Sequence, residues 1–461
     1  MFTVLIQTLG CKLNQLESEA IAEAFGKSGF TLYKPSSGAS PSVIVINTCT
    51  VTSKADQKAR RVIRKALRDY PESCVLVTGC YAMLNKEDLL NLGSNGGQRL
   101  FVFNKEDILK LPQYFCNKDS GSDASGIINK LTKINEQLSE NCEQGQENRK
   151  DVFQFNPRQF SVHTRGFLKI QDGCDKHCTY CRIRLARGQS VSLDAKTALE
   201  RLHILEENHA EAVLTGVNIC QYRDEKDAAN LARLLEYLLS GTEKIALRLS
   251  SLAPESIDED FANVLSHKRI RPHFHLSIQS GSKKILEKMG RSYNAKTIEE
   301  AIALLRRAKD DPFLACDIIT GFPGETEVEF EETYNLCKRT GFAWIHVFPY
   351  SKRPGTPAWS FPGMVQEKEV SRRVRLFTDL AEQGRADYVR RWLGHEVDVL
   401  VEKGDGKFRR GISENHLKLL VQYNGEKTLA PGSVLRCKLL DAEKPGDFDA
   451  IGEAGSRFNG V

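Results

Sequence analysis

The sequence predicts an α/β protein in three parts: an N-terminal parallel α/β domain, a central partial TIM-type barrel and a small C-terminal all-β barrel. Short β-branched runs alternate with helical patterns up to residue 115, and longer versions of both resume from residue 164. Such alternation is typical of parallel sheets covered by helices. After Gly394 the pattern changes to short alternating runs separated by Gly, Asn and Pro, which favours a small β-barrel.

The composition is that of a soluble globular protein, with 41% hydrophobic and 27% charged residues. The 461 residues are enough for two to four domains at about 100–200 residues each. The net charge of +5 permits an RNA partner without requiring one. The N-terminus lacks the basic region and cleavage site of a signal peptide, and no stretch approaches the ~18 uninterrupted apolar residues of a membrane span. We therefore expect a cytoplasmic protein with no membrane partner.

The N-terminal domain is expected over residues 1–115. Its strands are predicted at 2–10, 41–48, 73–79 and 99–104, and its helices at 16–29 and 54–70. Residues 116–158 form a predicted linker or mobile insertion, because most of this stretch is polar and nearly free of aromatic residues. A short helix is predicted inside it at 128–138.

The barrel domain is expected over residues 159–392 and the C-terminal β-barrel over 393–456. The barrel strands are predicted at 166–173, 211–218, 245–251, 273–280, 313–323 and 344–351, with a long helix at 371–393 after them. Strand–helix units of this number and length fit a partial or full parallel barrel. The C-terminal strands are predicted at 396–403, 416–423 and 433–440.

Three cysteines follow the first barrel strand in a C-x₃-C-x₂-C spacing: Cys174, Cys178 and Cys181. Loops at the carboxyl ends of barrel strands are where barrel enzymes place their active sites. A zinc site would need a fourth ligand, for which His177 is the candidate, but neighbouring loop positions do not all reach one ion easily. Three thiolates holding a [4Fe–4S] cluster with one open iron fit the spacing better, and zinc stays the weaker alternative.

A second group of cysteines follows three strands of the N-terminal domain: Cys11, Cys49 and Cys80. Because the carboxyl ends of parallel strands lie along one edge of a sheet, we expect these three thiols to meet there and to hold a second cluster with an open iron. The alternative is that they are small buried apolar residues, as free cysteine often is. Cys74 begins a strand and is predicted to be structural. Thirteen cysteines in a chain without a signal peptide favour metal binding over a disulfide framework.

The motifs "LGCKLNQLESE", "NTCTVT", "TGCYA", "GCDKHCTYC" and "DIITGFPGET" resemble those of the radical S-adenosylmethionine (SAM) methylthiotransferases. The resemblance covers nearly the whole chain apart from the polar linker. Within that family, the first two motifs are most similar to the branch that modifies N6-threonylcarbamoyladenosine in tRNA. One departure stands beside the cysteine triad: Arg184 occupies a position where Pro is common, although Arg187 and Gly188 are kept.

The resemblance implies transfer of a methylthio group to C2 of N6-threonylcarbamoyladenosine at position 37 of tRNA. It implies two [4Fe–4S] clusters and SAM as cofactors, one open iron holding SAM and the other holding or delivering sulfur. The C–H bond at C2 is not acidic, so a carbon radical is needed to open it. The implied partners are the tRNA anticodon loop and an electron donor such as a flavodoxin or ferredoxin.

Three rival functions stay open. Two share the chemistry: methylthiolation of isopentenyladenosine in tRNA, or of a ribosomal protein side chain. The third is a non-catalytic iron–sulfur or zinc protein that binds RNA.

Residues around the barrel mouth are predicted to bind SAM. Tyr180 fits the family pattern just before the third cysteine of the triad, and polar residues end three predicted strands: Asn218, Arg248, Ser250, Ser277 and Gln279. For the strand-end residues, polar side chains that only satisfy loop backbone are the alternative.

The C-terminal barrel resembles the TRAM domain, an OB-like barrel that binds RNA, and its candidate phosphate contacts are Lys407, Arg409 and Arg410. Lys58, Arg61 and Lys65 share one face of a basic helix, for which a solvated surface is the commoner meaning.

Overall fold

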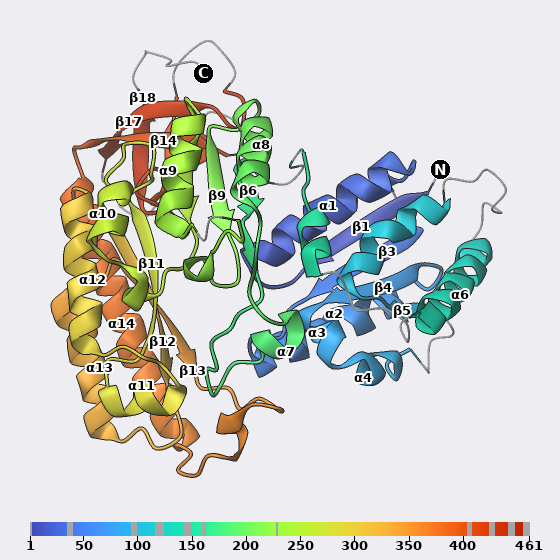
Figure 1. Ribbon diagram of the computed structural model, residues 1–461, viewed down its shortest axis with the longest axis horizontal. Helices are drawn as coiled ribbons and strands as arrows, with labels where there is room; N and C mark the ends of the chain where they lie inside the picture. Colours follow the sequence, from blue (N-terminus) through green and yellow to red (C-terminus); the bar gives the residue numbers. More distant parts are fainter. Residues whose placement is uncertain are drawn as a thin grey trace. The chain divides into compact units, whose positions relative to one another are not determined.

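The computed structural model describes residues 2–34, 40–93, 99–115, 124–141, 149–158, 160, 163–226, 229–402, 408–423, 429–440 and 448–454 (Figure 1). The chain divides into two compact units. The first unit comprises Met1–Ser161, Asp172–Lys176 and Cys181–Leu193, and the second comprises Val162–Gln171, His177–Tyr180 and Asp194–Val461.

The first unit contains a five-stranded sheet in the order β2-β1-β3-β4-β5, in which every pairing is parallel. Its strands are β1 (Thr3–Thr8), β2 (Thr31–Leu32), β3 (Val43–Thr48), β4 (Cys74–Gly79) and β5 (Leu100–Val102). Every residue of β3 and β4 is buried, as expected of central parallel strands with both faces covered. The predicted parallel α/β domain is therefore confirmed.

Helices follow the strands of this unit. They are α1 (Lys12–Lys27), α2 (Ser53–Asp69), α3 (Cys80–Leu84), α4 (Lys86–Leu90), α5 (Lys105–Lys110), α6 (Ala124–Asn141) and α7 (Ile183–Arg187), with 3₁₀ turns at Leu111–Phe115 and Arg149–Gln154. The short β7 (Gln171–Asp172) and β8 (Val191–Ser192) flank α7 in the chain.

Helix α6 lies inside the segment predicted as a linker, and it is longer than the short helix expected there. Ile127, Leu131 and Ile134 are buried at helical spacing, so the otherwise polar helix presents one apolar stripe. Lys130 lies 5.7 Å from the centre of the Phe115 ring. Sparse apolar residues at the right period are thus enough to fold this segment.

The second unit contains six parallel strands in two sheets, ordered β10-β9-β6 and β11-β12-β13. The strands are β6 (Gly166–Lys169), β9 (Glu211–Thr215), β10 (Ala246–Leu249), β11 (His273–Gln279), β12 (Phe313–Thr320) and β13 (Trp344–Pro349). A parallel bridge between Leu252 and Leu276 connects the β10 and β11 ends of the two sheets. This is the predicted partial TIM-type barrel.

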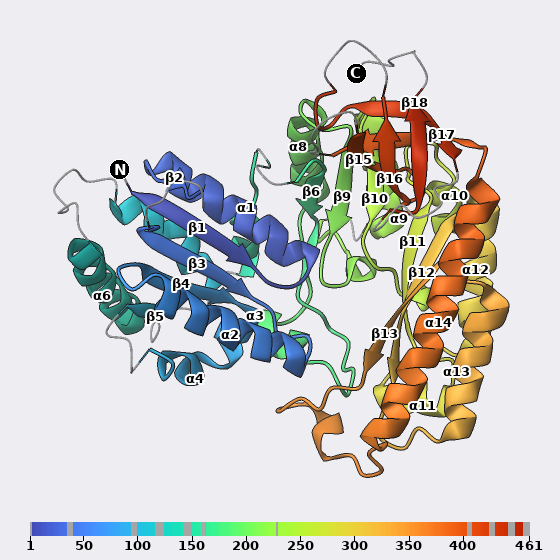
Figure 2. The ribbon, with the colours of Figure 1, turned by 180° about the vertical axis from the view of Figure 1, so that it is seen from behind.

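Helices cover the outside of these strands. They are α8 (Ala195–Glu206), α9 (Leu231–Gly241), α10 (Glu259–Leu265), α11 (Lys283–Met289), α12 (Ala295–Ala308), α13 (Glu327–Thr340) and α14 (Glu367–Trp392). Short 3₁₀ turns lie at Ile219–Gln221, Pro254–Ser256 and Pro357–Ser360. Figure 2 shows α12, α13 and α14 side by side along the outer face of β11, β12 and β13.

The C-terminal strands close into a five-stranded barrel in the order β14-β15-β16-β18-β17, which confirms the predicted all-β module. They are β14 (Glu396–Val401), β15 (Phe408–Ser413), β16 (Lys418–Gln422), β17 (Val434–Leu440) and β18 (Ala450–Ala454). Alternate side chains point inward to form its core: Val397, Val399, Val401, Leu419, Val421, Leu435, Cys437 and Leu439.

A buried ion cluster centred on Glu211 connects this barrel with the parallel strands. The Glu211 carboxylate, at the start of β9, accepts hydrogen bonds from Arg248 Nε at 2.6 Å and Arg271 Nε at 3.0 Å. Arg248 Nη2 also donates to the carbonyls of Ser413 and Glu414 in the C-terminal barrel. Burial alone would raise the pKa of Glu211, but Arg248, together with Arg271, lowers it to about 2.

Replacing Glu211 by glutamine is expected to lower the free energy of unfolding of the second unit by about 3–5 kcal/mol, because the charge of Arg248 is left buried without its partner. Glu211 has a lower pKa when folded than the ~4.3 of an unfolded glutamate. Its contribution is therefore full above pH ~4.3 and is lost as the pH falls towards 2. The measurement is chemical denaturation followed by tryptophan fluorescence, since Trp344, Trp359 and Trp392 all belong to this unit.

The matched control is Glu236→Gln, because Glu236 pairs with Arg233 on an exposed helix face where ion pairs contribute about 0–1 kcal/mol. Equal effects of the two substitutions at neutral pH, or a difference that persists unchanged at pH 2, would contradict the assigned role of Glu211.

Candidate active site

The structure places Cys11, Cys49 and Cys80 at the carboxyl ends of three adjacent strands of the first unit. Cys11 precedes α1 directly after β1, Cys49 follows β3, and Cys80 opens α3 directly after β4. Burial raises the pKa of Cys49 to about 11, and the nearby Cys11 and Cys80 thiols add to that rise. The three thiols therefore lie close enough to influence one another, as the strand-end rule predicts.

Two glycines allow this close approach. Gly10 has a φ of +106°, and a Cβ there would lie 2.4 Å from Cβ of Cys49. Gly79 has a φ of +95°, and a Cβ there would lie 2.4 Å from the carbonyl oxygen of Thr48. A side chain at either position would both strain the backbone and push neighbouring strand ends apart. The glycine before Cys11 and the glycine before Cys80 thus set the spacing of the thiols.

Buried amide side chains fix the same strand ends. Asn14 Nδ2 donates to the carbonyl of Leu9 at 2.8 Å and to the carbonyl of Thr48 at 2.9 Å, which connects the end of β1 with the end of β3. Asn47 Nδ2 donates in turn to the carbonyl of Asn14 at 3.0 Å. Because unsatisfied buried amides are costly, each of these bonds holds the site in one geometry.

Arg187 forms hydrogen bonds with a cysteine, an amide and two carboxylates of this site. Its guanidinium donates from Nε to Cys80 Sγ at 3.2 Å and from Nη2 to Asn14 Oδ1 at 3.1 Å. Nη1 donates to Glu17 and to Asp172, each at 3.0 Å. The side chain is only 3% exposed. Burial opposes its charge, yet Asp172, Cys80 and Glu17 raise the pKa of Arg187 well above its usual range.

Lys105 completes the charge balance around Arg187. Its ammonium group lies 2.9 Å from the Glu17 carboxylate, which is 1% exposed. Two buried cations thus face two buried carboxylates, Glu17 and Asp172, and the thiol of Cys80. The charges of these four side chains cancel, and the hydrogen bond from Arg187 Nε to Cys80 Sγ is the kind of contact that stabilises a cluster thiolate.

Cys174, Cys178 and Cys181 lie on the loop between β7 and α7, and all three are partly buried. In the first unit, the backbone N–H of Cys174 donates to the carbonyl of Gly188 at 3.1 Å, and the backbone N–H of Ile183 donates to Cys181 Sγ at 3.4 Å. A backbone N–H aimed at sulfur is the kind of bond that thiolate ligands of clusters receive.

The part of this loop that belongs to the second unit is anchored beside α11. Thr179 donates from its N–H to the carbonyl of Met289 at 3.0 Å, and from its hydroxyl to the carbonyl of Lys288 at 2.8 Å. The hydroxyl of Tyr180 accepts from Arg291 at 2.7 Å, and its ring contacts Phe322 edge-on. The position of Tyr180 is thereby fixed, and contact with SAM stays a prediction.

Among the described residues, no three His, Cys, Asp or Glu side chains converge on a single metal ion. The cysteines of a [4Fe–4S] cluster bind different iron atoms and do not converge in this way.

Four of the predicted SAM contacts lie at the carboxyl ends of neighbouring strands of the second unit. Asn218 and Ser250 follow β9 and β10, and Ser277 and Gln279 lie in the last part of β11. Gln279 has a φ of +68°, at a shift in the β11–β12 register. A non-glycine residue in this region is strained, which is common at binding sites. SAM binding by these four residues stays a prediction.

The prediction that the Arg248 side chain points towards the barrel mouth and binds SAM is wrong. That side chain does not point to the carboxyl ends of the strands but towards Glu211 at the start of β9, and it is fully buried there. It also donates to carbonyls of the C-terminal barrel. The physical reason is the buried carboxylate, which holds the guanidinium as its counter-ion. Arg248 is therefore a structural residue and no candidate for SAM.

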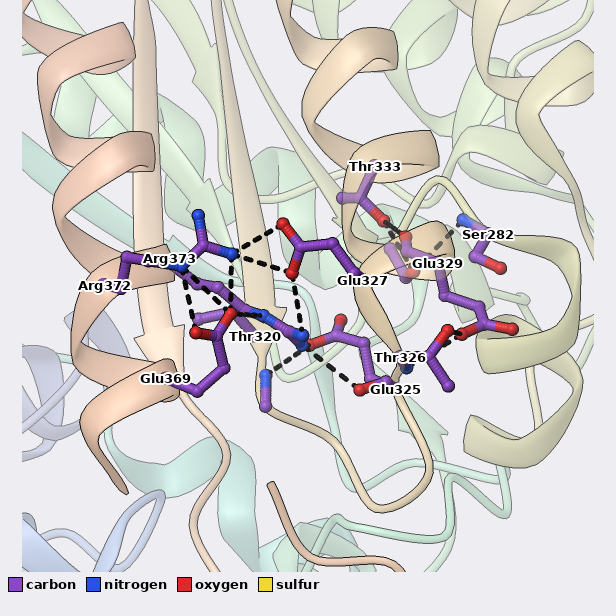
Figure 3. Close-up of polar contacts among 12 residues, drawn as sticks. Ser282, Thr320, Glu325, Thr326, Glu327, Glu329, Thr333, Glu369, Arg372 and Arg373 are labelled. Atoms are coloured by element: carbon purple, nitrogen blue, oxygen red, sulfur yellow. Dashed lines mark hydrogen bonds and ion pairs between the residues drawn. The ribbon is translucent and has the colours of Figure 1, made fainter. Parts of the chain in front are cut away.

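Sequence reasoning missed how the "GFPGET" loop after β12 is held (Figure 3). Glu325 accepts hydrogen bonds from the N–H of Gly321 at 2.6 Å and from Arg373 Nη1 of α14 at 2.8 Å. Arg373 also bonds Glu369 at 2.8 Å and lies 5.1 Å from the centre of the Phe330 ring. Burial raises the pKa of Glu325. This ion pair fastens the loop to α14, and no local sequence signal announces a pairing over 48 residues.

The predicted RNA contacts are only partly described. Lys407 lies outside the described residues. Arg409 is partly buried and Arg410 exposed on β15, where Arg410 lies 6.0 Å from the centre of the Phe448 ring. Among the described helices, none combines the length and apolar character needed to cross a membrane.

Residues 168–337 match the Radical SAM superfamily, and residues 3–96 match the uncharacterized protein family UPF0004. Threonylcarbamoyladenosine tRNA methylthiotransferase MtaB of Treponema pallidum (strain Nichols) is 38% identical, over 95% of this chain and 98% of its own. The protein of the same name from Bacillus subtilis (strain 168) is 32% identical, over 96% and 95%.

Two further proteins are similar. The tRNA-2-methylthio-N(6)-dimethylallyladenosine synthase of Thermotoga petrophila (strain ATCC BAA-488 / DSM 13995 / JCM 10881 / RKU-1) is 31% identical, over 86% of this chain and 85% of its own. Among solved structures, the cobalamin-dependent S-adenosylmethionine radical enzyme OxsB aligns with a TM-score of 0.45 at 12% identity, over 83% of this chain and 56% of that chain.

The triad of Cys174, Cys178 and Cys181 and the superfamily match over the same region define the class. This is a radical SAM enzyme, which uses SAM and an iron–sulfur cluster. Since relatives of one name reach 38% identity over nearly the full length, the chain belongs to the family of threonylcarbamoyladenosine tRNA methylthiotransferases. The family predicted from the sequence motifs is therefore confirmed.

Proposed function

We propose that this chain transfers a methylthio group to C2 of N6-threonylcarbamoyladenosine at position 37 of tRNA, using SAM and two [4Fe–4S] clusters. The observation that carries the proposal is the second cysteine group, Cys11, Cys49 and Cys80, gathered at one sheet edge beside Arg187. A radical SAM enzyme that only makes a radical needs one triad, whereas sulfur transfer calls for a second site. The names of the most similar relatives agree with this substrate.

Each cysteine group has an assigned role in the proposal. Cys174, Cys178 and Cys181 hold the cluster that supplies SAM-derived radical chemistry when it is bound. Cys11, Cys49 and Cys80 hold the cluster at which sulfur is held or delivered, and Arg187 holds the thiol of Cys80 in place.

Further residues are assigned to binding. SAM contacts are assigned to Tyr180, Asn218, Ser250, Ser277 and Gln279, and phosphate contacts to Lys407, Arg409 and Arg410. The proposed domains are 1–115, 116–158, 159–392 and 393–456, and an electron donor such as a flavodoxin or ferredoxin supplies the reducing electron.

The test is mass spectrometry of tRNA nucleosides from a strain lacking the gene, with and without the gene restored. We expect 2-methylthio-N6-threonylcarbamoyladenosine to disappear on deletion, with its unmethylthiolated precursor accumulating, and to return on complementation. Loss of the 2-methylthio derivative of isopentenyladenosine instead would transfer the assignment to the substrate named for the Thermotoga petrophila relative. Unchanged levels of both nucleosides would reject the function in tRNA.

A further inference from the structure

Helix α2 carries a charge equal to that of the whole protein. Its 17 residues include seven Lys and Arg and only two Asp, a net charge of +5. The full chain has 65 basic and 60 acidic residues, which is also +5. The remaining 58 basic and 58 acidic residues therefore cancel. The excess positive charge of the protein is concentrated on a single helix of the first unit.

The basic residues of α2 are exposed while its apolar residues are not. Ala59, Ile63 and Ala66 are buried against β3 and β4. The opposite side exposes Lys54, Lys58, Arg61, Arg64 and Lys65. Four of these follow the spacing i, i+4, i+7, i+11, so they form one stripe about 16 Å long. We call these five residues the basic stripe.

Within the described residues, no member of the basic stripe forms an ion pair or a hydrogen bond through its side chain. This differs from other exposed cations on helices, such as Arg233, Lys296 and Arg339, each of which has a glutamate partner. The two basic residues of α2 outside the stripe are engaged: Arg68 pairs with Asp69, and Arg60 donates to the hydroxyl of Tyr81. The stripe thus keeps its positive potential uncompensated, which attracts a polyanion.

The stripe begins close to the candidate sulfur-delivery site. The N-cap residue Thr52, whose side chain accepts from the N–H of Ala55, stands three positions after Cys49. The same helix is fixed to the site at a second point, since Tyr81, the partner of Arg60, directly follows Cys80. A polyanion lying along the stripe would therefore approach the strand-end edge that holds Cys49 and Cys80.

We propose that the basic stripe of α2 binds the phosphate backbone of the tRNA substrate and so guides it to the strand-end edge of the first unit. The inference rests on the proposed function, which supplies the RNA. Lysine and arginine bind phosphates largely by releasing condensed counterions, so each contact adds to the salt dependence of binding. A lipid surface does not fit as the partner, because insertion needs an exposed apolar face and that face of α2 is buried on the sheet.

The test compares Arg61→Ala/Lys65→Ala with the wild type, both as full-length protein with reconstituted clusters, for binding of an unmodified tRNA transcript across a series of KCl concentrations. Two lost phosphate contacts should raise Kd about tenfold or more at low salt and reduce the slope of log Kd against log[salt] by about 1.4–1.8. In turnover, KM for tRNA should rise by more than kcat falls. The matched control is Arg233→Ala/Lys296→Ala, which removes two exposed cations that have glutamate partners.

The outcomes separate this inference from the proposed function. If the wild type methylthiolates tRNA and the α2 variant binds the transcript with the same Kd and salt slope as the control, the basic stripe does not bind RNA, whereas the function stands. A stripe that serves an acidic protein would give this same result. If the wild type neither binds nor modifies tRNA, the proposed function fails and the role of α2 fails with it.

Discussion

Cys80→Ala is expected to lose about half of the iron of the reconstituted protein and to lower methylthiolation by more than about 100-fold, since removing one of three thiolates leaves the second cluster without its ligand set. Cleavage of SAM should persist, because Cys174, Cys178 and Cys181 are untouched. The measurements are iron and sulfide content, product formation, and release of 5′-deoxyadenosine under anaerobic conditions.

Cys74→Ala is the matched control for this prediction. Cys74 opens the same strand that Cys80 follows, and it is fully buried. Cys74 lies at the opposite end of β4 from Cys80 and packs as a small buried residue, and this burial also raises the pKa of its thiol to about 12. We expect its variant to keep its full iron content. If Cys80→Ala keeps as much iron as Cys74→Ala, the first unit holds no cluster and the proposed mechanism is wrong.

The gathering of the three cysteines at one edge of the sheet could be predicted from the sequence. Cys11, Cys49 and Cys80 each follow an apolar, β-branched run, and the rule that parallel strands end at one edge is enough to bring them together. Local patterns carry this information because a strand of five or six residues is visible in its own sequence. The cysteine triad at Cys174–Cys181 was visible for the same reason, as a short spacing on one loop.

The side chains that hold the site could not be predicted, because their partners lie far apart in the chain. Arg187 stands 107 residues from Cys80 and 170 from Glu17, and no periodicity connects such positions. The sequence pattern predicts the strand that carries Arg248 but not the direction of its side chain. Its direction is decided by one buried carboxylate, Glu211, on a neighbouring strand. A buried charge is thus readable from sequence only when its partner is local.

Arg187 makes the second large prediction, because it binds both a candidate cluster ligand and two buried carboxylates. Arg187→Leu should lower the free energy of unfolding of the first unit by about 3–5 kcal/mol, since the buried carboxylates of Glu17 and Asp172 both lose their guanidinium partner. Arg187→Lys should fold, because the charge is kept, but a single ammonium cannot reproduce the fork that reaches Cys80 Sγ and Asn14 together.

The lysine variant tests positioning apart from folding. Hydrogen bonds to cluster sulfurs are among the interactions that set the reduction potential. Loss of the bond from Nε to Cys80 Sγ should therefore lower the midpoint potential of the cluster in the first unit and change its electron paramagnetic resonance spectrum. The titration is made in protein with Cys174, Cys178 and Cys181 replaced by alanine, so that any cluster observed belongs to the first unit.

Arg99→Lys is the matched control for Arg187→Lys. Arg99 is a second arginine of the same unit. Its guanidinium donates to the carbonyls of Tyr70 at 3.1 Å and Ser73 at 2.9 Å, which lie just before β4, whereas Cys80 follows the other end of that strand. It should change stability without moving the potential. A merely structural Arg187 would behave in the same way, so an unchanged potential and spectrum in Arg187→Lys would refute its action on the cluster, whatever the variant does to stability.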